Sequence, residues 1–358
     1  MTIDEIRALI ESQDYDFLRT NPHLQHIAFL TLGGSYAYGT NIETSDVDIR
    51  GCAMESVSDI IGMSHFENVV DHATDTTIYA FNKLITLLYN CNPNVIEILG
   101  CKPEHYLFLS DVGIAMINNR KMFLSKRAAY TFGGYAHSQL RRLENAIARD
   151  KLPQDRKEVH IKNSLDKVVK NFNNEGRSAP VQCTLSIADA IHEDLEKETF
   201  ITMSLDHYPV RDLKALVNDI NNVISDYQNE LRSRNKKKDD LHLNKHAMHL
   251  IRLYLMCIDI LEKEEIVTYR EKEHDLLMSI RNGQFQLEDG TFASSFFDLV
   301  HDLSKRMEYA KENSALPQTP DMKQIEEFVM DVNWSVINGV YGTNQNANQR
   351  WPYPIKVA

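Results

Sequence analysis

The chain has 358 residues, of which 43% are hydrophobic and 25% charged, an ordinary composition for a globular protein of two domains with a sizeable core. Its 39 basic and 51 acidic residues give a net charge of −12, which argues against a protein that coats nucleic acid non-specifically with its whole surface. The first residues given, Met-Thr-Ile-Asp-Glu-Ile-Arg, do not have the pattern of a basic stretch followed by an apolar core, no apolar run reaches membrane-spanning length, and the five cysteines are scattered without a Cys-x-x-Cys pair. We therefore expect a soluble, cytoplasmic protein without membrane contact, disulfide framework or zinc site.

The first predicted elements lead to a glycine-rich turn. Residues 3–11 have apolar side chains at helical spacing, and Ile27–Leu32 is a short apolar run typical of a buried strand. Gly33, Gly34 and Ser35 follow this strand directly. Glycine permits backbone geometries that a side chain would obstruct, so a phosphate fits on such a turn beside the Ser35 hydroxyl. The turn is therefore a candidate phosphate-binding site.

Two carboxylates follow the turn. Asp46 and Asp48 stand two residues apart in the run Asp-Val-Asp-Ile, which we assign to a second strand. Side chains at i and i+2 of a strand point to the same face, so both carboxylates can reach one divalent cation or a pair of them. Each motif alone is common, but a glycine turn followed by paired carboxylates, each after a predicted strand, indicates a phosphoryl-transfer site.

The strand signals end before the middle of the chain. Glu67–Asp71 and Thr76–Phe81 are predicted to be the two strands of a hairpin. From about Lys121 onward helical spacing dominates, which places a domain boundary between residues 118 and 119. Helices are predicted over Phe123–Asp150, Val159–Phe172, Leu185–Glu198, Leu213–Leu231, Leu241–Leu261, Glu271–Arg281, Ser294–Lys311 and Met322–Asn338. The predicted organisation is a small domain, residues 1–118, followed by a larger helical domain, residues 119–358.

The helical domain carries two groups of basic residues. The predicted helix Leu241–Leu261 has a polar stripe that includes His249 and Arg252. The stretch 141–170 is also rich in arginine and lysine. Such stripes are usually solvated helix faces, but in a cleft they would meet phosphates, and the middle stretch is where we expect RNA contact.

The turn and the carboxylates together resemble the nucleotidyltransferases of the DNA polymerase β superfamily. The residues that match its hallmark are Gly33, Gly34, Ser35, Asp46 and Asp48. More narrowly, Gly-Ser-Tyr-Ala-Tyr-Gly-Thr followed by Ser-Asp-x-Asp-x-Arg-Gly is similar to the RlaP branch, predicted nucleotidyltransferases associated with RNA ligases. Three later stretches support the narrower resemblance: 83–99, 134–142 and 245–253.

The resemblance implies a fold and further site residues. The fold would be α+β, a small mixed-sheet domain like the polymerase β palm followed by a larger all-helical domain. The superfamily places a third carboxylate on a strand beside the first pair, and the candidates are Asp75 and Asp71, of which we favour Asp75. Lys83 becomes a candidate ligand of triphosphate, with a solvated helix residue as the alternative. His249 and Arg252 become candidate nucleotide contacts.

The resemblance also implies a reaction. A two-ion site holding Mg²⁺ or Mn²⁺ on Asp46, Asp48 and Asp75 would transfer a nucleoside monophosphate from a nucleoside triphosphate such as ATP to a hydroxyl, with release of pyrophosphate. The expected acceptor is an RNA end. The alternatives are nucleotidylation of a protein or a small molecule, and a non-catalytic nucleotide- or RNA-binding regulator. The sequence leaves the preferred triphosphate and the oligomeric state open.

Overall fold

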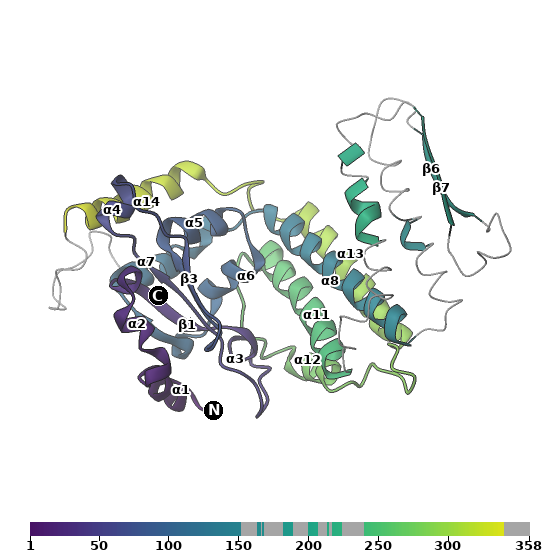
Figure 1. The fold of residues 1–358 in the computed structure, drawn as a ribbon, viewed down its shortest axis with the longest axis horizontal. Helices are drawn as coiled ribbons and strands as arrows, with labels where there is room; N and C mark the ends of the chain where they lie inside the picture. Colours follow the sequence, from purple (N-terminus) through teal and green to yellow (C-terminus); the bar gives the residue numbers. More distant parts are fainter. Residues whose placement is uncertain are drawn as a thin grey trace. The chain divides into compact units, whose positions relative to one another are not determined.

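The computed structural model describes residues 1–151, 163–165, 167, 182–188, 200–206, 213–214, 217–223 and 240–339 (Figure 1). The fold divides into two compact units. The described residues of the first unit come from Met1–Gln139, Ala247–Phe285 and 294–339. Those of the second come from Leu140–His246 and Gln286–Ala293.

A five-stranded sheet forms the centre of the first unit. Its strands are β1 (Ile27–Leu32), β2 (Ile49–Ala53), β3 (Asn68–Asp71), β4 (Thr76–Ala80) and β5 (Tyr106–Leu109). Their spatial order is β3-β4-β2-β1-β5, with β2 and β4 parallel and every other neighbouring pair antiparallel. The predicted strand Ile27–Leu32 and the predicted hairpin are thereby confirmed, and the sheet is mixed, as an α+β fold requires.

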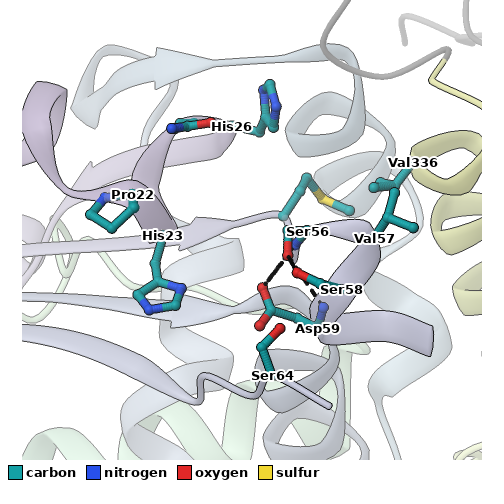
Figure 2. A pocket seen from close by; sticks show the side chains of 11 residues that line it. Pro22, His23, His26, Ser56, Val57, Ser58, Asp59, Ser64 and Val336 are labelled. Carbon is teal, nitrogen blue, oxygen red and sulfur yellow. Dashed lines mark hydrogen bonds between the residues drawn. The ribbon is translucent and has the colours of Figure 1, made fainter. Parts of the chain in front are cut away.

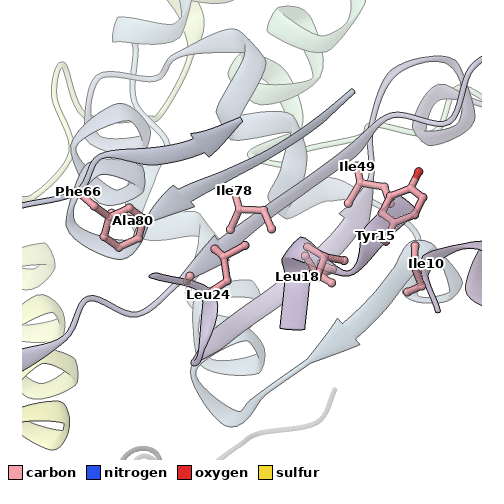
Figure 3. Close-up of a cluster of buried hydrophobic side chains, with 10 residues drawn as sticks. Ile10, Tyr15, Leu18, Leu24, Ile49, Phe66, Ile78 and Ala80 are labelled. Carbon is pink, nitrogen blue, oxygen red and sulfur yellow. The ribbon is translucent and has the colours of Figure 1, made fainter. Parts of the chain in front are cut away.

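One face of the sheet carries the hydrophobic core shown in Figure 3. The amino-terminal helices that cover it are α1 (Ile3–Ile10) and α2 (Phe17–Thr20), together with the short helices η1 (Gln13–Tyr15) and η2 (Pro22–Leu24). Leu18 and Leu24 from this segment pack with Leu30, Ile49 and Ile78 from the three central strands. The alternation of side chains along a strand sends Ile49 into this core and its neighbour Arg50 to the opposite face.

Helices also cover the opposite face of the sheet. Helix α7 (Asp111–Asn118) lies so close to β1 that a Cβ atom on Gly113 would come within 2.4 Å of the carbonyl oxygen of Ala28. The other helices that follow the strands in this part of the chain are α4 (Val57–Ile61), α5 (Phe81–Tyr89), α6 (Pro93–Ile96) and η3 (Glu97–Gly100). Strand β1 is therefore buried on both faces, which explains its continuous apolar run.

The carboxyl-terminal helices contribute to the first unit. They are the part of α11 (Asp240–Lys263) from Ala247 onward, α12 (His274–Arg281), α13 (Ser294–Asn313) and α14 (Met322–Ile337). Phe328 of α14 packs against Phe81 at the start of α5, with ring centroids 6.2 Å apart. The compact units are thus not divided at residue 118, and whether residues 1–118 form a domain that folds by itself stays a prediction.

Helices dominate the rest of the described chain, and the expected α+β fold with a predominantly helical remainder is confirmed. α8 (Arg127–Lys151) is the longest of these helices in the described residues. The helix predicted over Leu185–Glu198 is wrong at its start, because β6 (Gln182–Ala188) pairs antiparallel with β7 (Phe200–Asp206). Leu185 and Ile187 stand two residues apart, a spacing that places both side chains on one face of a strand. Most of the helices predicted over Val159–Phe172 and Leu213–Leu231 lies outside the described residues.

The structure was also searched for membrane-spanning segments. Among the residues that the structure describes, no helix combines the length and the apolar character needed to cross a bilayer.

Candidate active site

The glycine turn joins β1 to a short helix. Gly33 follows the last residue of β1, and α3 (Gly34–Tyr38) begins directly after it. Gly39 closes this helix in the left-handed conformation, with φ of 74°, a backbone geometry that glycine adopts without steric cost. The backbone N–H of Gly33 donates to the carbonyl oxygen of Asp48 at 2.8 Å. One hydrogen bond therefore ties the candidate phosphate-binding turn to the candidate metal-binding segment.

The carboxylate of Asp48 lies directly on this turn. Gly34 has φ of +53°, and a Cβ atom built on it would fall 1.7 Å from Oδ2 of Asp48. No residue with a side chain fits there unless Asp48 moves. Only glycine therefore lets the carboxylate and the start of α3 approach each other, which is a physical reason for the second glycine of the motif.

Asp46 and Asp48 precede strand β2 instead of lying on it. The strand begins at Ile49, and the two residues belong to the extended segment before it. The predicted strand was therefore assigned about three residues too early, an error common at strand ends. The Asp48 side chain is 19% exposed, and Asp46 belongs to the exposed residues.

The structure distinguishes the two candidates for the third carboxylate. Asp75 directly precedes β4, and the parallel register that pairs Ile49 with Thr76 puts Asp75 beside Asp48. Asp71 ends β3, and its carboxylate accepts hydrogen bonds from the N–H and hydroxyl of Thr74, both at 2.9 Å. Asp75 is thus the acid next to Asp48, and Asp71 stabilises the turn between β3 and β4.

Arg50, a residue that the sequence did not single out, links Asp48 to Asp75. Its Nη2 atom lies 3.4 Å from an oxygen of each carboxylate. Its Nη1 atom donates to the carbonyl oxygens of Asp75 at 2.6 Å and Ile49 at 2.9 Å. The signal that could have found it is its position two residues after Asp48, where a strand presents both side chains on one face.

Lys83 is not brought to these carboxylates. It lies on α5, beyond the carboxyl end of β4, while Asp75 lies before the amino end of the same strand. Five strand residues at about 3.3 Å each separate the two positions. The Lys83 ammonium pairs with Glu67 at 2.8 Å. The predicted contact of Lys83 with triphosphate stays a prediction, and the position of Lys83 does not support it.

Arg252 is an internal residue in this structure. Its side chain is 1% exposed, and Nη1 donates to Oε2 of Glu97 at 2.8 Å. Its Nη2 atom lies 2.9 Å from Nδ1 of His249, and the guanidinium stacks on Tyr38 with 3.6 Å to the ring centroid. The Tyr38 hydroxyl donates to the other Glu97 oxygen at 2.7 Å. The nucleotide contacts predicted for Arg252 and His249 stay predictions, since the described contacts of Arg252 are all within the protein.

This buried network supports the turn from within. Tyr38 is the last residue of α3, so its contacts with Glu97 and Arg252 hold the helix that begins at Gly34. Burial raises the pKa of the Tyr38 hydroxyl well above its usual range, and Arg252 opposes this shift while Glu97 and Asp48 add to it. Tyr38 therefore acts as a neutral hydrogen-bond donor at neutral pH.

The donor set at the turn suits a hard cation. Within the described residues no group of three or more His, Cys, Asp or Glu side chains is arranged around a common point. The carboxylates of Asp48 and Asp75 do share one cationic partner, Nη2 of Arg50, and a bound cation would contact the same carboxylates. Mg²⁺ is usually bound by one or two protein carboxylates and completed by substrate phosphates and water. Asp48 and Asp75 therefore fit such an ion, and a contribution of Asp46 stays a prediction.

A separate cavity of about 520 Å³ lies at the other end of β2 (Figure 2). Met54, which follows the strand, lines it, whereas Asp48 precedes the strand. Figure 2 shows Ser56, Ser58 and Asp59 joined by hydrogen bonds inside it. These groups form the cap of α4, where the Ser56 hydroxyl accepts from the Asp59 N–H. Their bonding capacity is thus largely used by the protein, and none of the described residues that line the cavity is a lysine or an arginine that would bind a phosphate.

Comparison with known proteins gives one match. Residues 6–165 match the family model RlaP, described as the RNA repair pathway DNA polymerase beta family. This range includes the glycine turn, the three candidate carboxylates and Arg50. No curated protein and no solved structure matches the chain.

Proposed function

Because residues 6–165 belong to the RlaP family of DNA polymerase β-type proteins, we propose that this chain is a metal-dependent nucleotidyltransferase that transfers a nucleoside monophosphate from a triphosphate to a hydroxyl group. The single observation that carries the proposal is the arrangement at the turn. Gly34 admits the Asp48 carboxylate against the start of α3, and Asp75 shares a cationic partner with it. Membership of the family supports nucleotidyl transfer in general, and the acceptor and the metal are proposed.

The proposed roles follow from the position of each residue. Asp46, Asp48 and Asp75 would hold Mg²⁺ or Mn²⁺, which supplies charge stabilisation for the leaving pyrophosphate and lowers the pKa of the attacking hydroxyl. Gly33, Gly34 and Ser35 would hold the terminal phosphates, with backbone N–H groups and the Ser35 hydroxyl as donors. Because the turn is tied to Asp48 by the Gly33 hydrogen bond, phosphate and metal ligands are positioned as one unit.

An RNA end is the proposed acceptor. The description of the matching family places it in RNA repair. The stretch 141–170 is rich in basic residues despite the acidic net charge of the chain. Among these basic residues, Arg142 and Lys167 are exposed at the surface. Exposed basic side chains support contact with a phosphate backbone. Arg156, Lys157, Lys162 and Lys170 of the same stretch lie outside the described residues.

Pyrophosphate release tests the reaction class. The protein is incubated with each nucleoside triphosphate in turn, with Mg²⁺ or Mn²⁺ and with total RNA, and pyrophosphate and orthophosphate are measured separately. We expect pyrophosphate with at least one triphosphate, dependent on both the divalent ion and the RNA. Orthophosphate without pyrophosphate would identify hydrolysis of the triphosphate at its γ-phosphate instead and would contradict the proposal.

A further inference from the structure

Arg50 occupies the centre of the proposed site. It is the second residue of β2, paired with Thr31 of β1 on one side and with Thr77 of β4 on the other. Its side chain is 25% exposed. Its stem lies against the glycine turn, since a Cβ atom on Gly33 would come 3.0 Å from Cγ of Arg50. One side chain therefore contacts the turn and both neighbouring carboxylates.

The two ends of the guanidinium are held with different strength. Nη1 donates to two backbone carbonyl oxygens at 2.6 and 2.9 Å, distances of ordinary hydrogen bonds. Nη2 reaches the carboxylates of Asp48 and Asp75 only at 3.4 Å, longer than the usual 2.7 to about 2.9 Å of a charge-assisted hydrogen bond. The backbone therefore anchors Arg50, while its contacts with the carboxylates are loose and partly open to solvent.

The loose end stands where a metal ion would bind. A divalent ion on Asp48 and Asp75 would need the same carboxylate oxygens that face Nη2, and two cations on these oxygens would repel each other. The anchored end does not have to move, because no carboxylate is involved in its hydrogen bonds. Because Nη1 and Nη2 belong to one planar guanidinium, Nη2 would leave the carboxylates by a tilt of the whole group about its Nη1 hydrogen bonds.

We propose that Arg50 is the resident counter-cation of the metal site, an inference that rests on the proposed function. In the metal-free protein Nη2 takes the place of the ion and keeps two adjacent carboxylates from repelling each other. When the divalent ion binds, Nη2 leaves the carboxylates and donates to the oxygens of the triphosphate, which guanidinium groups recognise well. Arg50 thereby links metal binding to triphosphate binding.

Metal affinity without nucleotide is the first test, and it needs no turnover. Mn²⁺ binding is measured by isothermal titration for the wild type, Arg50→Gln and Arg50→Lys. We expect Arg50→Gln to bind Mn²⁺ about tenfold more tightly, since a competing charge has been removed. Arg50→Lys, which keeps the charge, should stay within about threefold of the wild type. Equal or weaker Mn²⁺ binding by Arg50→Gln would overturn the proposal.

The second test is triphosphate binding, which Arg50→Gln should weaken although it strengthens Mn²⁺ binding. For Arg50→Gln the KM for the triphosphate should rise at least about tenfold, with a smaller fall in kcat, because the lost contact is made with bound substrate. The opposite directions for metal and nucleotide distinguish this role from simple structural damage, which would weaken both. An unchanged KM would overturn the second half of the proposal.

Matched variants separate failure of this inference from failure of the proposed function. Arg306→Gln removes another arginine, which pairs with Glu262 at 2.6 and 3.0 Å, and should leave Mn²⁺ affinity unchanged. Asp48→Asn should lose Mn²⁺ binding. If Asp48→Asn binds Mn²⁺ like the wild type, the metal site itself is wrong. If only Arg50→Gln behaves like the wild type, the metal site stands and the role of Arg50 is wrong.

A measurement on the wild type covers the case in which Arg50→Gln does not fold. The side-chain Nε–H resonance of Arg50, assigned by its loss in Arg50→Lys, is followed by NMR while Mg²⁺ is added. Displacement of the guanidinium by the ion predicts a shift that saturates with the metal and is absent in Asp48→Asn. A resonance that stays in place while the wild type binds Mg²⁺ would overturn the proposal.

Discussion

Replacement of Asp48 by asparagine is expected to lower the rate of pyrophosphate release by about a thousandfold while the protein stays folded. The amide keeps the shape of the side chain against Gly34 but is a much weaker ligand for a divalent ion. A metal-held transition state is stabilised by several kcal/mol, and about 4 kcal/mol corresponds to a factor of a thousand. The Asp48–Arg50 ion pair is 3.4 Å long and partly exposed, so the loss of this pair should cost less than about 1 kcal/mol of unfolding free energy.

Asp71 and Asp75 provide the matched comparison for this variant. Asp75→Asn should reduce the rate as Asp48→Asn does, because Asp75 shares the Arg50 nitrogen with Asp48. Asp71→Asn should leave it within about threefold, since an asparagine oxygen can still accept the hydrogen bonds from Thr74. If Asp48→Asn has the turnover rate of the wild type and an unchanged thermal unfolding curve, the proposed role of the aspartates as metal ligands is wrong.

Replacement of Glu97 by alanine is expected to destabilise the protein by about 3 to 5 kcal/mol, the usual cost of leaving one partner of a buried ion pair alone. Arg252 is 1% exposed and Glu97 13% exposed, and the pair also holds the Tyr38 hydroxyl. Without Glu97 the Arg252 charge stays buried with fewer partners. Urea unfolding, followed by circular dichroism, measures the change in unfolding free energy.

An exposed ion pair of the same chemistry is the control for Glu97. The Arg306 side chain, 52% exposed, pairs with Glu262, which is 31% exposed, and Glu262→Ala should cost no more than about 1 kcal/mol. The double variant Glu97→Ala/Arg252→Met should recover part of the loss, because it removes the unpaired charge as well. A loss below about 1 kcal/mol in Glu97→Ala would mean that Arg252 is not buried as the structure has it and is available to bind a nucleotide.

The sequence was sufficient for the parts of the fold that local patterns determine. The apolar run Ile27–Leu32 and the hairpin around Asp71 are strands as predicted. The glycine turn was predictable because the turn requires a glycine at position 34, where the Asp48 carboxylate occupies the space of a side chain. The juxtaposition of Asp75 with Asp48 required the strand register, and the resemblance to a known family supplied it in place of local pattern.

The errors have physical causes that single residues illustrate. A helical period shows that Arg252 shares a helix face with His249, but it does not show that Glu97, 155 residues earlier, covers that face. Lys83 follows the strand that carries Asp75 at its other end. Five strand residues at about 3.3 Å each lie between Asp75 and Lys83, so the predicted strand itself argued against placing Lys83 beside the carboxylates. The start of the predicted helix Leu185–Glu198 belongs to strand β6, and the strand period of Leu185 and Ile187 is too short a pattern to identify that strand from the sequence.

Transfer of label from an α-³²P-labelled triphosphate tests the central claim most directly. The wild type and the double variant Asp46→Ala/Asp48→Ala are incubated with Mg²⁺ or Mn²⁺, total RNA and each labelled triphosphate, and RNA and protein are then separated. We predict label on RNA that the double variant does not produce. Label on protein alone would contradict the RNA acceptor, and no label with any triphosphate, despite measurable triphosphate binding, would contradict nucleotidyl transfer itself.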